Sequence, residues 1–260
     1  WPLPSMAPLA HTLALLAMTV VAMATKKLPL DMAKNSFDDQ YWDCGPAMAA
    51  ALPALKYSEF QQNPLFARGW AKATAEWQCR GSRVYPLPSP DHAIALMAYT
   101  MDDLYREFNS AVRVAGRSRQ EYRDNFHWKT LHFLLTDALA VLNPAHQCYE
   151  VYRGVEGIHF TAERGHTVRF GQFTSASRLQ AVANEFGNDT KFQVYTCHGV
   201  AIWGYSAKVS QQEVLIPPFE TFKVTDVTQK GNTAEIRLHS NGIHSNYNCE
   251  WLRGDIMGTT

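Results

Sequence analysis

The spacing of hydrophobic residues changes character about halfway along the chain. In the first half, apolar residues recur every three or four positions, as Phe66, Trp70 and Ala73 do, and this is the spacing of one helix face. In the second half, short β-branched and aromatic runs are punctuated by glycine, a pattern typical of strands. Helices followed by strands predict an α+β fold, with a helical part over about residues 28–146 and a β-rich part over about 147–252.

Single residues mark the ends of several predicted helices. Asp91 precedes an apolar run at the position of a helix cap, while Gly116 and Asn143 follow apolar runs and are expected to end them. The predicted helices cover residues 47–52, 64–77, 92–100, 104–115 and 126–142. The predicted strands cover residues 149–155, 167–173, 192–197, 200–203, 213–217, 219–227 and 234–238.

The composition of the 260-residue chain allows a large hydrophobic core. Of its residues, 46% are hydrophobic and 18% are charged, which fits one large domain or two closely packed halves. The 24 basic and 24 acidic residues cancel, so bulk charge favours neither nucleic acid nor an anionic membrane as a partner. Attraction of a charged substrate must therefore be local, and we expect no nucleic-acid partner. We also expect the protein to be a monomer.

An apolar segment near the N-terminus predicts export from the cell. Residues 6–24 have an apolar core that ends in Ala-Met-Ala, a small-x-small cleavage pattern. We therefore predict a signal peptide over residues 1–24, with extra residues ahead of its true start, and a single mature domain over residues 25–260; a short buried helix is the alternative. No later run reaches the roughly 18 apolar residues of a spanning helix, so we expect a secreted protein without a transmembrane segment in the mature chain.

The sequence has five cysteines, and export would allow disulfide bonds among them. They are Cys44, Cys79, Cys148, Cys197 and Cys249, and none of their spacings is that of a metal site. Two bridges would leave one cysteine over. The residues alone leave the pairing open.

Polar residues within or beside three strand-like runs are candidates for a functional site. Arg153 lies inside one run, Ser175 and Ser177 lie in a second, and Gln211 and Glu213 lead into Val-Leu-Ile-Pro-Pro. Because side chains alternate along a strand, the two serines would share one face. Gln211 and Glu213 would share a face in the same way. A cleft between such strands would gather arginine, serine and glutamate.

These residues resemble the R-S-E signature of the vertebrate ecto-mono-ADP-ribosyltransferases. The match lies at Arg153, at the Ser175-x-Ser177 pair and at the Gln-x-Glu that ends at Glu213. The resemblance covers roughly residues 28–252 and implies an enzyme that uses NAD as a substrate, with no permanently bound cofactor and no metal. It also implies a fold in which a helical N-terminal part packs on a two-sheet, strand-rich core that binds NAD.

The resemblance implies a role for each matched residue. Glu213 would offset the positive charge that develops on the ribose as its bond to nicotinamide breaks. Ser175 would orient Glu213. Arg153 would grip the dinucleotide, while Gly154 would leave backbone amides open to nicotinamide; for Arg153, a structural ion pair with Glu156 is the alternative.

Three further residues are candidate NAD contacts. Gln172 precedes the serine motif, and Phe186 lies with Gly187 in a segment that the family uses as a loop over nicotinamide and the phosphates. Tyr99 stands near the end of a predicted helix, where it either reaches the cleft or belongs to the core.

The resemblance also implies a disulfide pairing, Cys44 with Cys249 and Cys148 with Cys197. The first bridge would tie the two ends of the chain. The second would hold the strand of the arginine to the segment that leads to the glutamate. Cys79 is left over, and we expect it to be a buried free thiol rather than an intermolecular link.

Gln211 departs from the family pattern. Arginine-specific members carry glutamate there, where it can position the acceptor guanidinium and accept its proton. Glutamine keeps the hydrogen bonding but loses the charge, whereas attack by water needs no such carboxylate. We therefore expect ADP-ribosyl transfer to an acceptor protein or a small guanidino compound, with substantial NAD glycohydrolase activity; the alternative is a secreted NAD-binding protein with weak or no catalysis.

Overall fold

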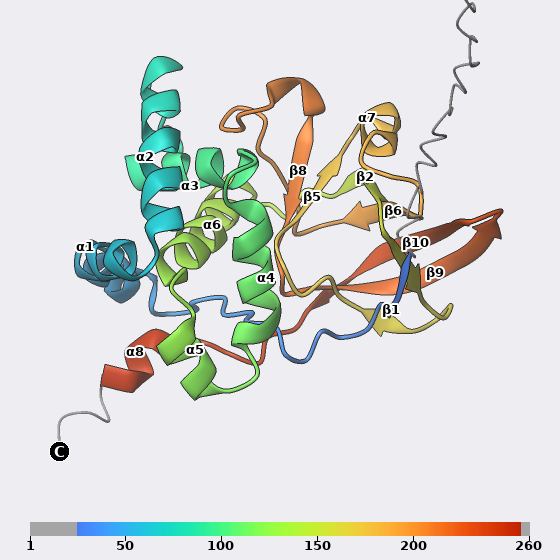
Figure 1. The fold of residues 1–260 in the computed structure, drawn as a ribbon, viewed down its shortest axis with the longest axis horizontal. Helices are drawn as coiled ribbons and strands as arrows, with labels where there is room; N and C mark the ends of the chain where they lie inside the picture. The colour runs from blue at the N-terminus through green and yellow to red at the C-terminus, as the bar shows by residue number, and fades with distance from the viewer. Residues whose placement is uncertain (1–24, 256–260) are drawn as a thin grey trace, which may run out of the picture.

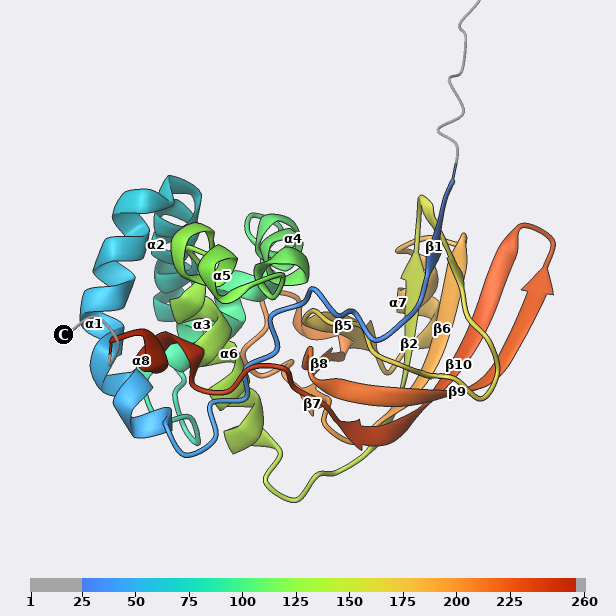
Figure 2. The same cartoon turned by 90° about the horizontal axis from the view of Figure 1, so that it is seen from below.

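The computed structural model describes residues 25–255 as a helical half joined to a strand-rich half (Figure 1). Seen from below, the helices of the N-terminal half gather on one side and the strands on the other (Figure 2). The predicted α+β fold is confirmed. The predicted signal peptide, residues 1–24, lies outside the described residues, and within residues 25–255 no helix is long and apolar enough to cross a bilayer.

The helices of the first half are positioned by local capping and by their buried faces. Asn63 caps the second helix by accepting a hydrogen bond from the Phe66 amide at 3.0 Å, and Pro64 takes the first helical position, which needs no amide hydrogen. Phe66, Trp70 and Ala73 are buried in the core, as their spacing predicts. The bounds are α1 (Gly45–Gln62), α2 (Pro64–Cys79), α3 (Pro90–Thr100), α4 (Tyr105–Ala115), α5 (Arg119–Asn125) and α6 (Lys129–Leu142).

Some predicted helix ends are corrected. Asp91 is not the cap of α3, because Pro90 already occupies the first helical position after the extended residue Ser89. α6 begins at Lys129 rather than at residue 126, since Trp128 before it has non-helical backbone angles. Three short helices lack enough turns to show a hydrophobic period and were not predicted: α5, α7 (Gln180–Asn184) and α8 (Glu250–Asp255).

The strands form two sheets, as expected, and the sheets differ greatly in size. The bounds are β1 (Lys26–Pro29), β2 (Tyr149–Val155), β3 (Ile158–Thr161), β4 (Thr167–Val168), β5 (Thr174–Ser177), β6 (Thr190–Thr196), β7 (Val200–Ala201), β8 (Glu213–Ile216), β9 (Glu220–Lys230) and β10 (Thr233–Ile243). The eight-stranded sheet has the order β4-β9-β10-β6-β2-β5-β8-β7, and the two-stranded sheet pairs β1 with β3. Neither β1 nor β3 was predicted.

The predicted strand 167–173 is wrong beyond Val168. Arg169 leaves the strand pattern because its guanidinium is fully buried and pairs with Asp38 at 2.5 Å. It also donates to the Met32 carbonyl at 2.6 Å, so it fastens the segment after β1 to the strand-rich half. A charge buried this deeply requires its partners, and these come from distant parts of the chain.

The order of the central strands brings the candidate residues together. β5 lies between β2 and β8, with Ser177 paired to Tyr152 on one side and to Glu213 on the other. Arg153, Ser175 and Glu213 therefore project from three neighbouring strands of one sheet.

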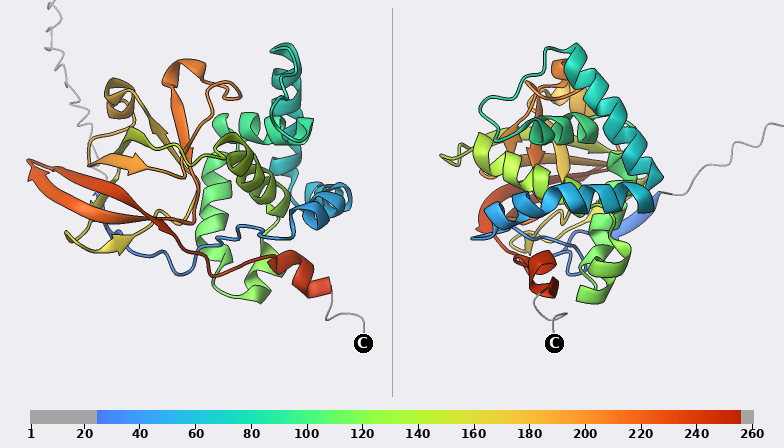
Figure 3. Two further views of the ribbon diagram at one scale, coloured as in Figure 1. Left: turned by 180° about the vertical axis from the view of Figure 1, so that it is seen from behind. Right: turned by 90° about the vertical axis from the view of Figure 1, so that its left-hand side faces the viewer.

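Both disulfides implied by the resemblance are present, Cys44–Cys249 and Cys148–Cys197. The first joins segments 205 positions apart and the second joins segments 49 apart. The chain after β1 and the chain before α8 run side by side into the helical half (Figure 3), where Asp39 accepts hydrogen bonds from the amides of Cys249 and Glu250, both at 2.9 Å. The first bridge thus joins the start of α1 to the residue just before α8.

Cys79 is free, as expected, but the prediction that it is buried is wrong, since its thiol is exposed. An α-helix turns about 100° per residue, so Cys79 lies about 240° around α2 from the buried Ala73. Trp77 lies only about 40° from Ala73 and packs against the core. The hydrophobic stripe of α2 therefore faces away from Cys79.

Candidate active site

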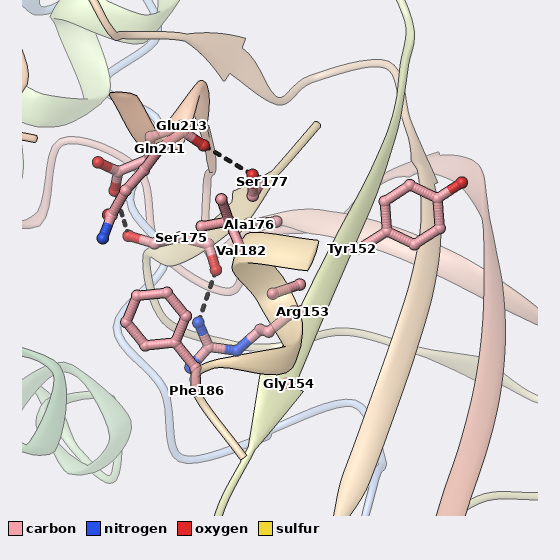
Figure 4. Close-up of a pocket in the computed structure, with 11 residues that line it drawn as sticks. Tyr152, Arg153, Gly154, Ser175, Ala176, Ser177, Val182, Phe186, Gln211 and Glu213 are labelled. Atoms are coloured by element: carbon pink, nitrogen blue, oxygen red, sulfur yellow. Dashed lines mark hydrogen bonds between the residues drawn. The ribbon is translucent and has the colours of Figure 1, made fainter. Parts of the chain in front are cut away.

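One pocket in the strand-rich half contains most of the predicted site residues (Figure 4). It lies among β2, β5 and β8, with α7 and the 3-10 helix η1 (Val209–Gln211) at its border. Its lining residues are Tyr152, Arg153, Gly154, Ser175, Ala176, Ser177, Val182, Ala183, Phe186, Gln211 and Glu213. The pocket therefore includes all the predicted contacts except two, Tyr99 and Gln172.

Glu213 is a buried carboxylate at the start of β8, and a hydroxyl holds each of its oxygens. It is 6% exposed. Ser175 Oγ donates to its Oε1 at 2.5 Å, and Ser206 Oγ donates to its Oε2 at 3.1 Å. Burial raises the pKa of Glu213 above its ordinary value of 4.5, and the two serine hydrogen bonds oppose that rise. Ser175 thus contacts Glu213 directly, and its expected role in orienting the carboxylate stays a prediction.

Arg153 brings a positive charge to the same pocket. Its Nη1 donates to the backbone carbonyl of Ser175 at 2.6 Å, so the guanidinium lies beside the serine strand (Figure 4). No carboxylate in the described part of the chain lies within ion-pair distance of it, and the alternative pairing with Glu156 does not occur. Burial lowers the pKa of Arg153 below its ordinary value, because a guanidinium removed from water loses solvation of its charge. A bound anion would supply that partner.

Gly154 allows α7 and the loop after it to approach β2 closely. A Cβ at this position would lie 2.3 Å from the Ala183 carbonyl oxygen and 2.5 Å from that of Gly187. Gly187 itself has φ +124, which a side chain rarely permits. Between these contacts Phe186 is placed at the pocket with half of its surface exposed, near the Arg153 guanidinium (Figure 4).

Gln211 lines the pocket, but the strand alternation predicted for it is wrong. It ends η1, and Gln212 after it has left-handed backbone angles, φ 44 and ψ 51. The chain therefore enters β8 through a tight turn instead of an extended strand. Ser177 Oγ donates to the Gln211 carbonyl at 2.6 Å and fixes this turn. Gln211 and Glu213 reach one pocket because of the turn and not because of a period of two.

The pocket thus combines one carboxylate, one guanidinium, three side-chain hydroxyls and one carboxamide. A carboxylate next to a sugar can offset positive charge on it, and a guanidinium can bind phosphate oxygens in pairs. No group of three or more histidine, cysteine or acidic side chains within residues 25–255 is arranged to hold a metal ion. The pocket therefore has groups that can interact with a sugar and with phosphate oxygens.

A family model described as NAD:arginine ADP-ribosyltransferase matches residues 30–246. The chain belongs to this family. It is 51% identical over 228 residues to NAD(P)(+)–arginine ADP-ribosyltransferase 2 of Gallus gallus, covering 86% of this chain and 73% of that protein. It is 46% identical over 248 residues to GPI-linked NAD(P)(+)–arginine ADP-ribosyltransferase 1 of Homo sapiens, covering 88% of this chain and 76% of that protein.

Solved structures of a mono-ADP-ribosyltransferase have a similar fold. The crystal structure of the eukaryotic mono-ADP-ribosyltransferase ART2.2 superposes with a TM-score of 0.75 at 39% identity, covering 85% of this chain and 98% of that one. A mutant of ART2.2 in complex with NAD gives the same TM-score and coverage at 38% identity. The expected fold, a helical part on a strand-rich core of the ADP-ribosyltransferase type, is confirmed.

Two predicted NAD contacts lie outside the pocket of this family member. Tyr99 is 3% exposed, and its hydroxyl donates to the Phe173 carbonyl at 2.8 Å and accepts from Asn109 Nδ2 at 3.1 Å. Burial raises the pKa of Tyr99 to about 12, so it stays neutral. Gln172 accepts a hydrogen bond from Arg113 on α4. The core interpretation of Tyr99 therefore agrees with its position. Gln172, which precedes β5, contacts α4 of the helical half.

The structure adds site residues that the sequence did not indicate. Val182 and Ala183 line the pocket because α7 folds over it, and a five-residue helix leaves no readable period. Tyr152 also lines it, although its ring points away from the other labelled side chains (Figure 4). Ser206 lies behind Glu213, seven positions earlier in the chain, and no motif marks it.

Proposed function

We propose that this protein cleaves NAD and transfers ADP-ribose to an arginine side chain or a small guanidino compound, with hydrolysis of NAD as a substantial competing reaction. The observation that carries this proposal is the meeting of Glu213, Ser175 and Arg153 in one pocket. Family membership supports it, because the relatives bear the name of that reaction.

The proposed chemistry begins with loss of nicotinamide from its ribose. The glycosidic C–N bond breaks, its electron pair leaves with the pyridinium, and nicotinamide departs neutral, so no acid is needed. The ribose carbon becomes oxocarbenium-like. The Glu213 carboxylate, fixed by two hydroxyls, would accept a hydrogen bond from the ribose 2′-OH and offset this charge without reorganising.

Arg153 and Phe186 would hold the rest of the dinucleotide. The Arg153 guanidinium has no carboxylate partner within residues 25–255, and the NAD pyrophosphate offers the paired oxygens that suit it. Phe186 lies at the same end of the pocket and presents an exposed ring to a flat base or to nicotinamide. Binding would thus neutralise a charge that burial disfavours.

Gln211 supports the expectation of competing hydrolysis. Its neutral amide can hydrogen-bond a guanidinium but cannot accept the proton that the attacking nitrogen loses. The nucleophile forms the new bond to the ribose carbon, and its proton must then pass to solvent. Attack by water does not need a base at position 211, so hydrolysis would proceed with the groups that the pocket contains.

An experiment with NAD and agmatine tests the proposal. Purified protein is incubated with both, and free ADP-ribose is separated from ADP-ribosyl-agmatine. We expect both products, and we expect Glu213→Gln to reduce both rates at least a hundredfold, since about 3 kcal/mol of preorganised stabilisation is lost. Tight NAD binding with no turnover would instead support the inactive binding protein.

The compartment is part of the proposal. Two disulfides within the described chain are typical of an oxidising environment, and the relatives include GPI-linked enzymes. We place the protein outside the cell, as one ADP-ribosyltransferase domain over residues 25–260. Intact-mass analysis of secreted material would locate the processed N-terminus.

A further inference from the structure

Glu213 is held from two sides of the molecule. Ser175, which donates to Oε1, comes from the neighbouring strand β5. Ser206, which donates to Oε2, comes from the loop between β7 and η1. Ser206 is 1% exposed and is absent from the pocket lining, so it contacts the carboxylate from behind.

The Ser206 hydroxyl is directed at the carboxylate by its other contact. The backbone amide of Lys208 donates to Ser206 Oγ at 3.0 Å. Because this bond occupies an acceptor site of the hydroxyl, the single hydroxyl hydrogen stays available for Glu213 Oε2. The orientation of the donor is therefore set by backbone geometry.

The loop of Ser206 is itself anchored to the helical half. Arg80, which follows the last residue of α2, donates from Nη1 to the Ser206 carbonyl and from Nη2 to the Ala207 carbonyl, both at 3.0 Å. The Ala207 amide donates to Thr100 Oγ1, at the end of α3, at 2.9 Å. The ends of α2 and α3 thus hold Ser206 in place, while β5 holds Ser175, the other donor to the carboxylate.

We propose that Ser206 is a positioning residue for the reaction, which holds Oε2 of Glu213 and favours its ionised form, so that the carboxylate faces the ribose with a fixed orientation. This inference rests on the proposed role of Glu213. It assigns part of the catalytic geometry to the helical half, through Arg80 and Thr100.

The charges around Glu213 determine the direction of the effect. Arg153 on β2 and Lys208 before η1 both favour the ionised form, and Tyr99 on α3 is neutral. Burial opposes ionisation, and Ser175 and Ser206 supply the hydrogen bonds that work against burial. Removal of the Ser206 donor leaves burial less opposed, so the pKa of Glu213 must rise.

The test is the pH profile of kcat/KM for NAD hydrolysis by Ser206→Ala. Loss of a hydrogen bond to a charged group changes the pKa of that group by about one unit. The acid limb of the profile should therefore shift to higher pH by about one unit, and kcat/KM at a fixed pH on that limb should fall about tenfold. The KM for NAD should change by less than about twofold, because Ser206 does not meet the pocket. Ser206→Thr keeps the hydroxyl and should restore the limb.

Ser240→Ala is a matched control. Ser240 Oγ donates at 2.7 Å to Oε1 of another buried carboxylate, Glu220, which lies outside the pocket. Ser240→Ala should leave the acid limb of the kcat/KM profile unchanged. If calorimetry shows that Ser206→Ala does not fold, Ser206→Cys keeps the volume with a weaker donor and should move the limb in the same direction.

The outcomes separate this inference from the proposed function. A folded Ser206→Ala with an unchanged acid limb overturns the inference, provided that Glu213→Gln is inactive. A folded Ser206→Thr that behaves like the alanine variant also overturns it. Full activity of Glu213→Gln would overturn the proposed function itself.

Discussion

At the scale of single residues, the pocket contains a carboxylate, Glu213, and a carboxamide, Gln211, which we expect to have different roles. Glu213 is buried in the pocket, and in the proposed reaction it would act on the ribose, which transfer and hydrolysis share. Gln211 is partly exposed and reaches the pocket from the turn before β8. The identity of the residue at 211 should therefore affect the acceptor, while the residue at 213 affects every reaction of NAD.

We predict that Gln211→Glu raises transfer to agmatine about tenfold or more, because a carboxylate there can hold the guanidinium and take its proton. Hydrolysis should stay within about threefold of the native rate. The measurement is the ratio of ADP-ribosyl-agmatine to free ADP-ribose. Gln212→Glu is the control. Gln212 is exposed and lies outside the pocket, so this substitution adds the same negative charge one position away. A native enzyme that already modifies agmatine as fast as the Gln211→Glu variant would contradict the prediction.

Burial of Glu213 also predicts an effect on stability. Its pKa in the folded protein is raised above the ordinary 4.5 of the unfolded chain. The free energy of unfolding therefore falls as the pH rises from about 4.5 through the folded pKa, because the unfolded chain ionises more easily. Glu213→Gln cannot ionise. We therefore expect the variant to have the higher Tm at neutral pH, with a difference that narrows in acid. Calorimetry at several pH values measures this, and a difference that widens in acid would refute it.

At the scale of elements, the approach of α7 to β2 shapes one end of the pocket. That approach depends on Gly154, whose hydrogen leaves room for the carbonyls of Ala183 and Gly187. Phe186 between them is carried by a loop with no regular structure of its own. The position of this ring thus follows from a steric fit between a strand and a short helix.

We predict that Gly154→Ala displaces α7 and lowers kcat/KM for NAD about tenfold or more, since small displacements of positioning groups have large kinetic effects. The overpacking should also destabilise the protein by about 1–3 kcal/mol. Gly45→Ala is the matched control, because no atom lies within 4 Å of an added Cβ there. Equal kinetics for both variants would show that the contact does not position the loop.

At the scale of the whole molecule, the two halves are held together by links between distant segments. Arg169 and Asp38 form a fully buried ion pair between the strand-rich half and the chain after β1. Phe173, the residue just before β5, packs in the core of the helical half. The Cys44–Cys249 bridge closes the largest loop, 205 positions.

We predict that removal of Cys44–Cys249 destabilises the protein more than removal of Cys148–Cys197. On the chain-entropy estimate the two bridges contribute about 5 and about 4 kcal/mol, because the first closes the longer loop. Serine variants of each pair, compared by denaturant unfolding, measure the difference. Cys79→Ser should be neutral, since that thiol is free and exposed. The opposite order of stability would show that native-state contacts outweigh loop length.

The sequence alone determined the features that depend on local pattern and on the matched signature. The periods of three to four residues placed α2, α3 and α4, and the β-branched runs placed β2 and β6, because each element buries one face and shows it in its spacing. Arg153, Ser175 and Glu213 were identified by their order in the chain, and they do line one pocket. The disulfide pairing followed from the family resemblance.

Only the tertiary structure decided the features that depend on distant partners. Arg169 ended a predicted strand because Asp38, far along the chain, binds its charge. Gln211 reached the pocket through a left-handed residue, which no hydrophobic period reveals. Ser206 became a partner of Glu213 because Arg80 and two helices hold its loop there. A hydrogen bond needs position and direction, and for these residues the fold supplies both.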